Sequence, residues 1–196
     1  PLILHEGNAV PGRANQIFSR FADVLMYSMP ALETARVHCE VVFSGMPVRE
    51  QIVNAASHCD APPAWYHERG LRPDYPTLLA FGGSQGAKHI NQTLAQAVEQ
   101  LGSMCSWFQL IHLTGREDNE KVKEHYRSLG LHAYVATREA EMEKCYAMAD
   151  LVISRAGACT ISELALFGIP VILVPLPTAK DDHQQANANA LALRHA

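Results

Sequence analysis

The sequence lacks any apolar run long enough to cross a bilayer as a helix, which takes about 20 residues. Its best run, residues 170–177, has the length of a strand. It also lacks a basic stripe interleaved with aromatic residues, and its net charge is −4, so a general nucleic-acid-binding protein is excluded. Hydrophobic residues make up 48% of the chain and charged residues 18%, which is typical of a protein that buries a core.

Cysteines are few and show no pairing pattern. The chain has five, an odd number, and none forms a Cys-x-x-Cys pair: Cys39, Cys59, Cys105, Cys145 and Cys159. This spacing favours free thiols in a reducing cytoplasm and predicts neither a disulfide framework nor a zinc site.

Apolar, strand-like segments alternate with helix-like segments from residue 77 onward. The expected strands are 77–81, 107–113, 132–136, 151–154 and 171–174, and the expected helices are 88–101, 118–129, 139–149, 160–167 and 181 onward. The strands are almost continuously apolar, as strands buried on both faces are. This alternation predicts an α/β fold with a parallel, doubly wound, Rossmann-like sheet.

The first part of the chain repeats this theme in a shorter form, with strands at 2–5, 24–28 and 40–43 and a helix at 12–21. Residues 57–76 contain four prolines among polar residues, which predicts an irregular connector. We therefore expect a fragment with three parts. Residues 1–47 would be the tail of a first α/β domain, 48–76 a linker, and 77–196 a second α/β domain truncated at its end.

Ligands of open parallel sheets bind beyond the carboxyl ends of the strands, so the residues that follow each strand carry the functional information. Residues 82–87 read GGSQGA and open the helix expected from Lys88. Glycines allow close approach of an anion, and helix N-terminal amides bind phosphate. The spacing is neither that of a dinucleotide fingerprint nor that of a P-loop, and a tight turn without a ligand remains an alternative.

A second glycine-bearing turn, RAGACTISE at 155–163, follows the strand at 151–154. Thr160 and Glu163 have the spacing of a capping box, which would explain them without a ligand. Alternatively, Glu163 accepts hydrogen bonds from ribose hydroxyls while the turn amides face a phosphate. Two such turns in one sheet favour a nucleotide diphosphate site.

Further candidates follow other strands. Gln184 could bind sugar hydroxyls, and Asn8 follows the first strand. Arg49 lies at the exit from the first part of the chain, although a lone arginine is usually a solvated charge. A metal site at residues 181–183 is disfavoured because adjacent side chains of a helix point in different directions.

Taken in order, these motifs resemble the MurG family, glycosyltransferase family 28. The resemblance covers nearly the whole chain and rests on five segments: HEGNAVPG at 5–12, GMPVR at 45–49, GGSQGA at 82–87, RAGA with Thr160 and Glu163 at 155–163, and DHQ with Asn187 at 182–187.

The resemblance implies the two-domain GT-B fold, with the donor in the second domain. It implies inverting transfer of N-acetylglucosamine from UDP to the 4-hydroxyl of undecaprenyl-pyrophosphoryl-muramyl pentapeptide, the lipid I to lipid II step of peptidoglycan synthesis. The enzyme would act on the cytoplasmic face of the bacterial membrane without a cofactor or an obligatory metal. The acceptor-side base is expected upstream of Pro1, so the fragment alone is expected to be inactive.

By motif match, the resemblance places Ser84 on the diphosphate, in a phosphate loop with Gly82, Gly83, Gln85 and Gly86. It places the ribose and the phosphate on one segment, in which Glu163 binds the ribose hydroxyls: Ala158, Cys159, Thr160, Ile161, Ser162 and Glu163. Arg49 would lie near the uracil, and Asn8 and Gln184 would contact the sugar.

The chain departs from the family pattern at several positions. Gly7 stands where the family usually has Gln, Met46 where it has Asn, and Arg138 and Glu139 where it has Phe-Ile. The uracil contacts that the family makes within 135–142 are therefore not carried over to this chain. Two alternatives remain open: another GT-B enzyme of UDP-sugars, including a 2-epimerase, and a non-catalytic nucleotide-binding module. An epimerase is expected to place its own carboxylates and histidines in the cleft, and the sequence shows no such cluster.

Overall fold

The computed structural model describes residues 1–29, 36–57, 63–83, 87–116, 118–177 and 182–193. Contacts between Cα atoms divide the chain into two compact units. Unit 1 comprises Pro1–Val48, Arg155–Glu163 and Pro175–Ala196, and unit 2 comprises Arg49–Ser154 and Leu164–Val174. Helix α7, Ala158–Phe167, begins in unit 1 and ends in unit 2.

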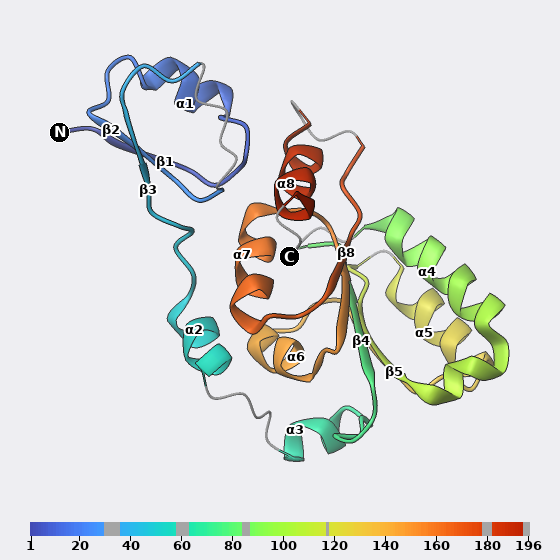
Figure 1. Cartoon of the computed structure of the whole chain (residues 1–196). Helices are drawn as coiled ribbons and strands as arrows, with labels where there is room; N and C mark the ends of the chain where they lie inside the picture. The colour runs from blue at the N-terminus through green and yellow to red at the C-terminus, as the bar shows by residue number, and fades with distance from the viewer. Residues whose placement is uncertain (30–35, 58–62, 84–86, 117, 178–181, 194–196) are drawn as a thin grey trace. The chain divides into compact units, whose positions relative to one another are not determined.

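Unit 2 contains a five-stranded parallel sheet in the order β6-β5-β4-β7-β8. Its strands are β4 (Thr77–Phe81), β5 (Gln109–Leu113), β6 (Ala133–Ala136), β7 (Leu151–Ser154) and β8 (Val171–Leu173). Helices α4 (Lys88–Leu101) and α5 (Asn119–Ser128) cover one face, and α6 (Met142–Met148) lies on the other (Figure 1). The predicted parallel, doubly wound α/β sheet is confirmed.

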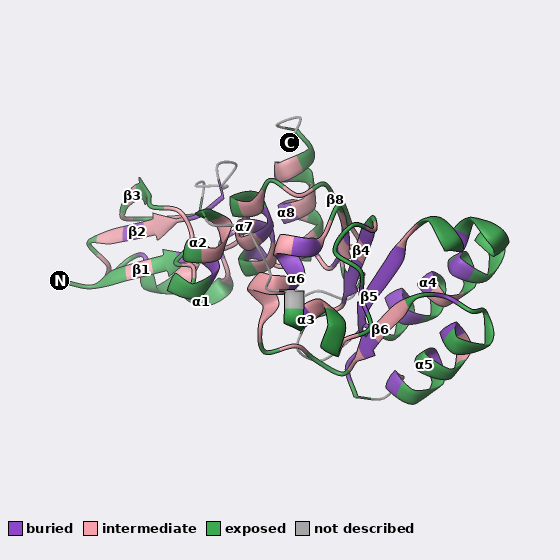
Figure 2. Cartoon of the chain, turned by 90° about the horizontal axis from the view of Figure 1, so that it is seen from below, coloured by how far each residue is buried: buried purple, intermediate pink, exposed green. Residues whose placement is uncertain are grey.

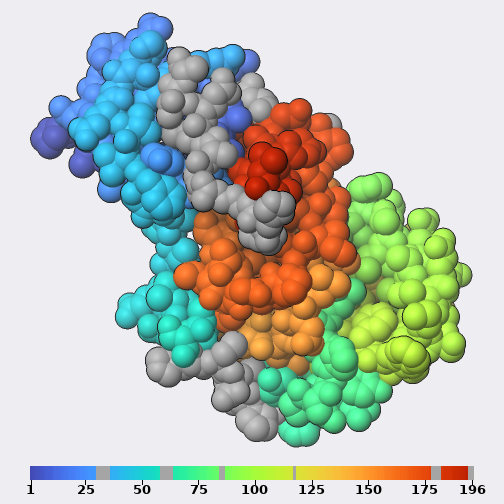
Figure 3. Space-filling model, in the orientation of Figure 1, coloured from blue at the N-terminus to red at the C-terminus, as the bar shows by residue number. Residues whose placement is uncertain are grey.

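The core of unit 2 lies between this sheet and helices α4 and α5, as the buried residues in Figure 2 show. Every residue of β5 is buried, including its two polar residues, Gln109 and His112. Helical spacing predicts one apolar face of α4. Three of its residues are buried (Ile90, Leu94 and Val98) and two are exposed (Ala97 and Leu101). The outward residues of α4, green in Figure 3, form part of the surface of unit 2. Hydrophobic burial on one face therefore fixes how α4 packs.

Unit 1 contains a three-stranded parallel sheet in the order β1-β2-β3. Its elements are β1 (Ile3–Glu6), α1 (Arg13–Phe18), β2 (Val24–Tyr27), β3 (Glu40–Phe43) and α8 (His183–Ala192). Glu6, Tyr27 and Phe43 lie opposite one another at the carboxyl ends of the three strands. The loop after β1 therefore starts at this edge of the sheet.

The segment between the two sheets is more regular than its prolines indicate. It forms α2 (Glu50–Ser57) and α3 (Pro63–Glu68), so the predicted irregular connector over 57–76 is wrong at residues 63–68. Pro63 occupies the first helical position, where a missing amide hydrogen costs nothing. Trp65 is buried. The domain boundaries expected at 47 and 76 stay predictions.

Strand β5 starts two residues later than the apolar pattern indicates. A 3₁₀ helix, η1 (Gly102–Trp107), precedes β5, so the strand expected from residue 107 begins at Gln109. Within the described ranges, no helix is long and apolar enough to span a membrane.

Candidate functional site

The carboxyl ends of four strands of unit 2 lie in one row. Phe81 at the end of β4 pairs with Ser154 of β7 on one side and with Leu113 of β5 on the other. Leu113 in turn pairs with Ala136 of β6. The segments that follow these strands therefore leave the same edge of the sheet. The chain order reverses between β4 and β7, and in open α/β sheets this is where ligands bind.

The first glycine turn leaves β4 at this edge. Gly83 has a φ of 87°, in a region that other residues rarely adopt, so glycine is required here by the backbone. Ala87 is the N-cap of α4 and is buried. Ser84, Gln85 and Gly86 lie outside the described residues. The phosphate-loop roles of Gly82, Gly83 and these three residues stay predictions.

The second glycine turn leads from β7 into α7, and its geometry removes one alternative. The helix begins at Ala158, and the Ile161 amide donates to the Gly157 carbonyl at 3.0 Å. Thr160 is thus the third helical residue, whereas the first residue of a capping box is the N-cap, outside the helix. The capping-box interpretation of Thr160 and Glu163 is therefore wrong.

The residues predicted to bind ribose and phosphate all lie in the first two turns of α7. Ala158 and Ile161 are buried, Cys159 is exposed, and Thr160, Ser162 and Glu163 are half-buried. The first amides of a helix have no intrahelical partner and can serve an anion. The binding roles of all six residues stay predictions.

Asn187 of α8 joins two of the predicted motifs within unit 1. Its Oδ1 accepts from the Ala9 amide at 2.8 Å, and its Nδ2 donates to the Asn8 Oδ1 and to the Ala156 carbonyl, each at 3.0 Å. Asn187 is fully buried. One side chain therefore fixes the loop after β1 against the turn before α7, a role that the sequence did not reveal.

Both polar atoms of the Asn8 side chain are hydrogen-bonded. Its Nδ2 donates to Glu6 Oε1 at 3.1 Å, and its Oδ1 accepts from Asn187. Burial would raise the pKa of Glu6, but hydrogen bonds from the amides of Asn8 and Gly12, and from Asn15, hold it below its ordinary value. Glu6 is therefore an ionised anchor of this loop. The contact of Asn8 with a sugar stays a prediction.

Gln184 lies in the first turn of α8, and its Oε1 accepts from the Leu176 amide at 2.9 Å. The N-cap of this helix, Asp182, has a φ of 55° and is, among the described residues, the one non-glycine residue with positive φ. Such strained positions cluster at binding sites, which is compatible with the predicted sugar contact of Gln184.

Residues 77–196 match the family model of the Glycosyltransferase family 28 C-terminal domain. The chain belongs to glycosyltransferase family 28.

Two relatives agree with family 28 membership. A Desulfotalea psychrophila protein named UDP-N-acetylglucosamine--N-acetylmuramyl-(pentapeptide) pyrophosphoryl-undecaprenol N-acetylglucosamine transferase is 41% identical over 189 residues, which are 96% of this chain and 48% of that protein. A protein of the same name from Dichelobacter nodosus is 40% identical and is matched over 98% of this chain and 51% of its own length. The chain spans about half the length of these relatives.

Solved structures agree with the family 28 assignment. The crystal structure of Acinetobacter baumannii MurG matches 99% of this chain and 51% of its own, with a TM-score of 0.74 and 32% identity. A glycosyltransferase from Rickettsia africae matches with a TM-score of 0.56 at 12% identity, covering 98% of this chain and 60% of its own, and this likeness concerns the fold alone. The predicted GT-B fold and the resemblance to the MurG family are confirmed.

Two departures from the family 28 pattern lie in contact. A Cβ on Gly7 would lie 3.3 Å from Met46 Cε and 3.5 Å from Ala158 Cβ. The Ser28 hydroxyl also donates to Met46 Sδ at 3.4 Å. Met46 therefore occupies the space that a side chain at residue 7 would need, so the two departures explain each other.

The third departure has a structural role. Arg138 is exposed, whereas the Glu139 side chain is 6% exposed and pairs with Arg69.

Arg49, the predicted neighbour of the uracil, is exposed and begins unit 2. Its role stays a prediction.

A buried polar network behind the strand edge was missed at the sequence level. Asn91 Nδ2 donates to the Thr114 carbonyl at 2.8 Å and to Asp118 at 3.0 Å, so its Oδ1 accepts from His112 Nε2. His112 Nδ1 then accepts from the Tyr126 hydroxyl at 3.0 Å. Burial lowers the pKa of His112 to about 4, although Asp118 opposes this. A neutral histidine thus ties α4 and α5 to the end of β5, and no local pattern signals it.

The described residues contain no candidate metal centre. In the part of the chain that the structure describes, no three His, Cys, Asp or Glu side chains form a group that could hold an ion.

Proposed function

We propose that this chain is the UDP-sugar-binding part of a family 28 transferase, which moves N-acetylglucosamine from UDP to the 4-hydroxyl of undecaprenyl-pyrophosphoryl-muramyl pentapeptide. The observation that carries this proposal is the alignment of nearly the whole chain with relatives named for that reaction. The full-length enzyme would then catalyse the conversion of lipid I to lipid II on the cytoplasmic face of the bacterial membrane.

The geometry supports a donor site of this kind. Departure of UDP from the anomeric carbon places negative charge on the diphosphate, and amides fixed in advance stabilise such charge. The segments after β4 and β7 each enter a helix from neighbouring strand ends. The first amides of each of these helices therefore suit a phosphate, and Glu163 lies one turn further along α7.

The first test is nucleotide recognition by the purified chain. UDP and ADP are titrated by calorimetry with a chelator present, and we expect a response to UDP that exceeds the response to ADP. An equal response to both nucleotides, or a response only after metal is added, would count against the proposed uridine site.

Glu163 provides the sharper test. Because Thr160 lies inside α7, a capping role no longer competes with the ribose role. Glu163→Gln replaces a charged acceptor by a neutral one, and hydrogen bonds to charged groups contribute about 1.5–3 kcal/mol against about 1 for neutral ones. The affinity for UDP should fall roughly tenfold at about 1.4 kcal/mol per decade.

The matched control is Glu120→Gln, which removes the same charge from an exposed position in α5. It should leave UDP binding unchanged. Equal affinity of Glu163→Gln and the unmutated chain would remove Glu163 from the donor site. Both alternatives, another GT-B enzyme of UDP-sugars and a non-catalytic nucleotide-binding module, would retain UDP binding. Neither would transfer N-acetylglucosamine from UDP to the lipid acceptor when the full-length protein is assayed.

A further inference from the structure

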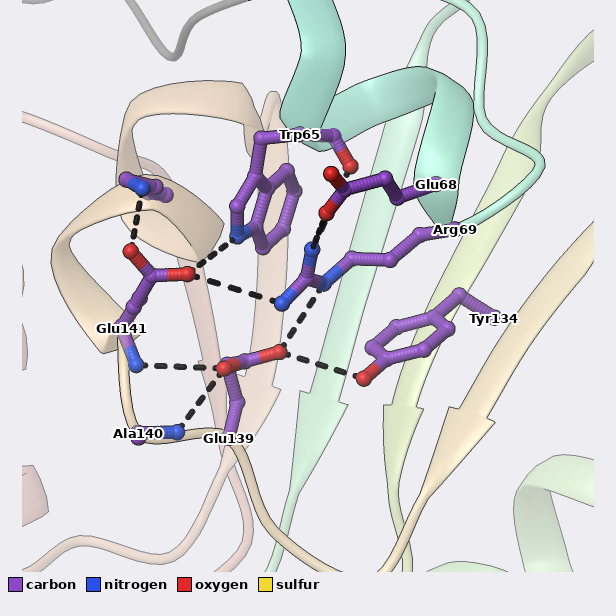
Figure 4. Close-up of polar contacts among 8 residues, drawn as sticks. Trp65, Glu68, Arg69, Tyr134, Glu139, Ala140 and Glu141 are labelled. Carbon is purple, nitrogen blue, oxygen red and sulfur yellow. Dashed lines mark hydrogen bonds and ion pairs between the residues drawn. The ribbon is translucent and has the colours of Figure 1, made fainter.

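A cluster of polar and aromatic side chains in unit 2 joins α3 to the loop between β6 and α6 (Figure 4). At its centre, Arg69 Nε donates to Glu139 Oε2 at 3.0 Å. The two side chains are 15% and 6% exposed, so this ion pair is far less solvated than a surface pair. Removing one partner of a buried pair leaves an uncompensated charge. A substitution of Arg69 or Glu139 should therefore perturb the structure more than a substitution in a surface ion pair.

Glu139 organises the backbone of the loop. Its Oε1 accepts from the amides of Ala140 at 2.9 Å and Glu141 at 3.2 Å, and its Oε2 also accepts from the Tyr134 hydroxyl at 3.1 Å. Burial would raise the pKa of Glu139, but its hydrogen bond with Arg69 holds it below the ordinary value. All four partners of the carboxylate are donors. The loop therefore depends on an ionised acceptor at this position.

The guanidinium of Arg69 is held by aromatic rings on two sides. Its Cζ lies 4.1 Å from the centre of the Trp65 ring and 5.5 Å from that of Tyr134. The Trp65 indole donates to Glu141 Oε2 at 3.0 Å, and Arg69 Nη2 lies 3.5 Å from the same oxygen (Figure 4). Two residues of the segment before β4 thus hold both carboxylates of the loop.

The loop lies where a donor nucleoside could reach it. It leaves β6 at Ala136, in the same row of strand ends as the glycine turn after β4. Two strand spacings of about 4.8 Å separate β6 from β4. The amide of Gly115, after β5, also donates to the Thr137 carbonyl at 3.1 Å, and Thr137 and Arg138 are exposed at this edge.

We infer that Arg69 and Glu139 are positioning residues for the nucleoside half of the donor. Neither needs to touch the ligand: they fix the β6–α6 loop at the edge of the sheet where the nucleoside would lie. This inference rests on the proposed function, and it assigns a positioning role to the residue that follows α3, outside the sheet itself.

The test separates the two halves of the ligand. The chain and its variants Arg69→Gln and Glu139→Gln are titrated with UDP and with inorganic pyrophosphate. In the unmutated chain every donor around Glu139 faces a carboxylate oxygen. In Glu139→Gln the side-chain NH2 group must face at least one of these donors, so the loop should shift. We expect affinity for UDP to fall at least about fivefold in each variant, and affinity for pyrophosphate to stay within twofold.

Two further variants keep the test decisive. Arg127→Gln breaks an exposed pair with Glu124 in α5, whose side chains are 67% and 72% exposed, and it should change neither affinity. Tyr134→Phe removes a single hydrogen bond to Glu139 and leaves the ion pair, so it should fold and lower UDP affinity about two- to fivefold.

Three outcomes would overturn the inference. The first is UDP affinity within twofold of the unmutated chain in the folded variants, Tyr134→Phe included. The second is an equal fall for UDP and pyrophosphate, which would indicate a general structural loss. The third is an unmutated chain that does not respond to UDP, which overturns the proposed function as well; the first two leave that function standing.

Discussion

Asn187→Ala perturbs the hydrogen bonds that join the loop after β1 to the turn before α7. The substitution leaves the Ala9 amide and the Ala156 carbonyl without the partner that each has in Asn187. Both residues are buried, so water cannot replace the lost bonds. A buried polar group without a partner costs about 1–3 kcal/mol, or about 2–6 kcal/mol for the two.

Alanine is the better helix former by about 0.5 kcal/mol, which offsets a little of this loss. The free energy of unfolding should therefore fall by about 2–5 kcal/mol, a large part of the 5–15 kcal/mol that is usual for a protein. Urea unfolding followed by circular dichroism measures this difference.

Asn189→Ala is the matched control, because Asn189 lies in the same helix but is exposed, where Gln185 donates to it at 3.0 Å. That variant should stay within about 0.5 kcal/mol of the unmutated chain. Asn187→Asp keeps the acceptor for Ala9 but turns oxygen toward Asn8 and Ala156, so it should cost at least as much as Asn187→Ala. A loss below about 1 kcal/mol in Asn187→Ala, or one equal to that of the control, would refute this reasoning.

Two other predictions concern single side chains. Because His112 has a native pKa of about 4 and an unfolded value of 6.5, the unfolded chain binds the extra proton between these values. The contribution of His112 to the free energy of unfolding should therefore be fully present above pH 6.5. About 3 kcal/mol of it should be lost as the pH drops toward 4. Urea unfolding across this range should show a flatter profile for His112→Gln, and an unchanged slope would contradict the assignment. Gly7→Gln should lower the melting temperature because of the 3.3 Å approach to Met46, and adding Met46→Asn should recover most of it. A calorimetric scan in which the double variant melts no higher than Gly7→Gln would show that the two residues are independent.

The sequence by itself determined the local elements and their order. The continuous apolar runs of β4 and β7 predicted the bounds that the structure has, because strands buried on both faces tolerate few polar residues. The face of α4 followed from helical spacing in the same way. Glycine after β4 was visible as a turn signal, and Gly83 shows the backbone reason for it.

The sequence was less informative where a helix began against the local signals. Thr160 and Glu163 had the spacing of a capping box, but α7 starts at Ala158. The prolines of the connector led to the prediction of an irregular segment where α3 lies, although proline is acceptable as the first residue of a helix, as Pro63 is here. In both cases the local residue types did not fix where the helix begins.

Only the tertiary structure decided which distant residues meet. Arg69 and Glu139 are 70 positions apart, and Asn8 and Asn187 are 179 apart. Each of these residues reads as an ordinary polar side chain in its own segment. Its role depends on burial and on a partner supplied by another part of the chain, because a polar group removed from water must find its hydrogen bonds within the protein.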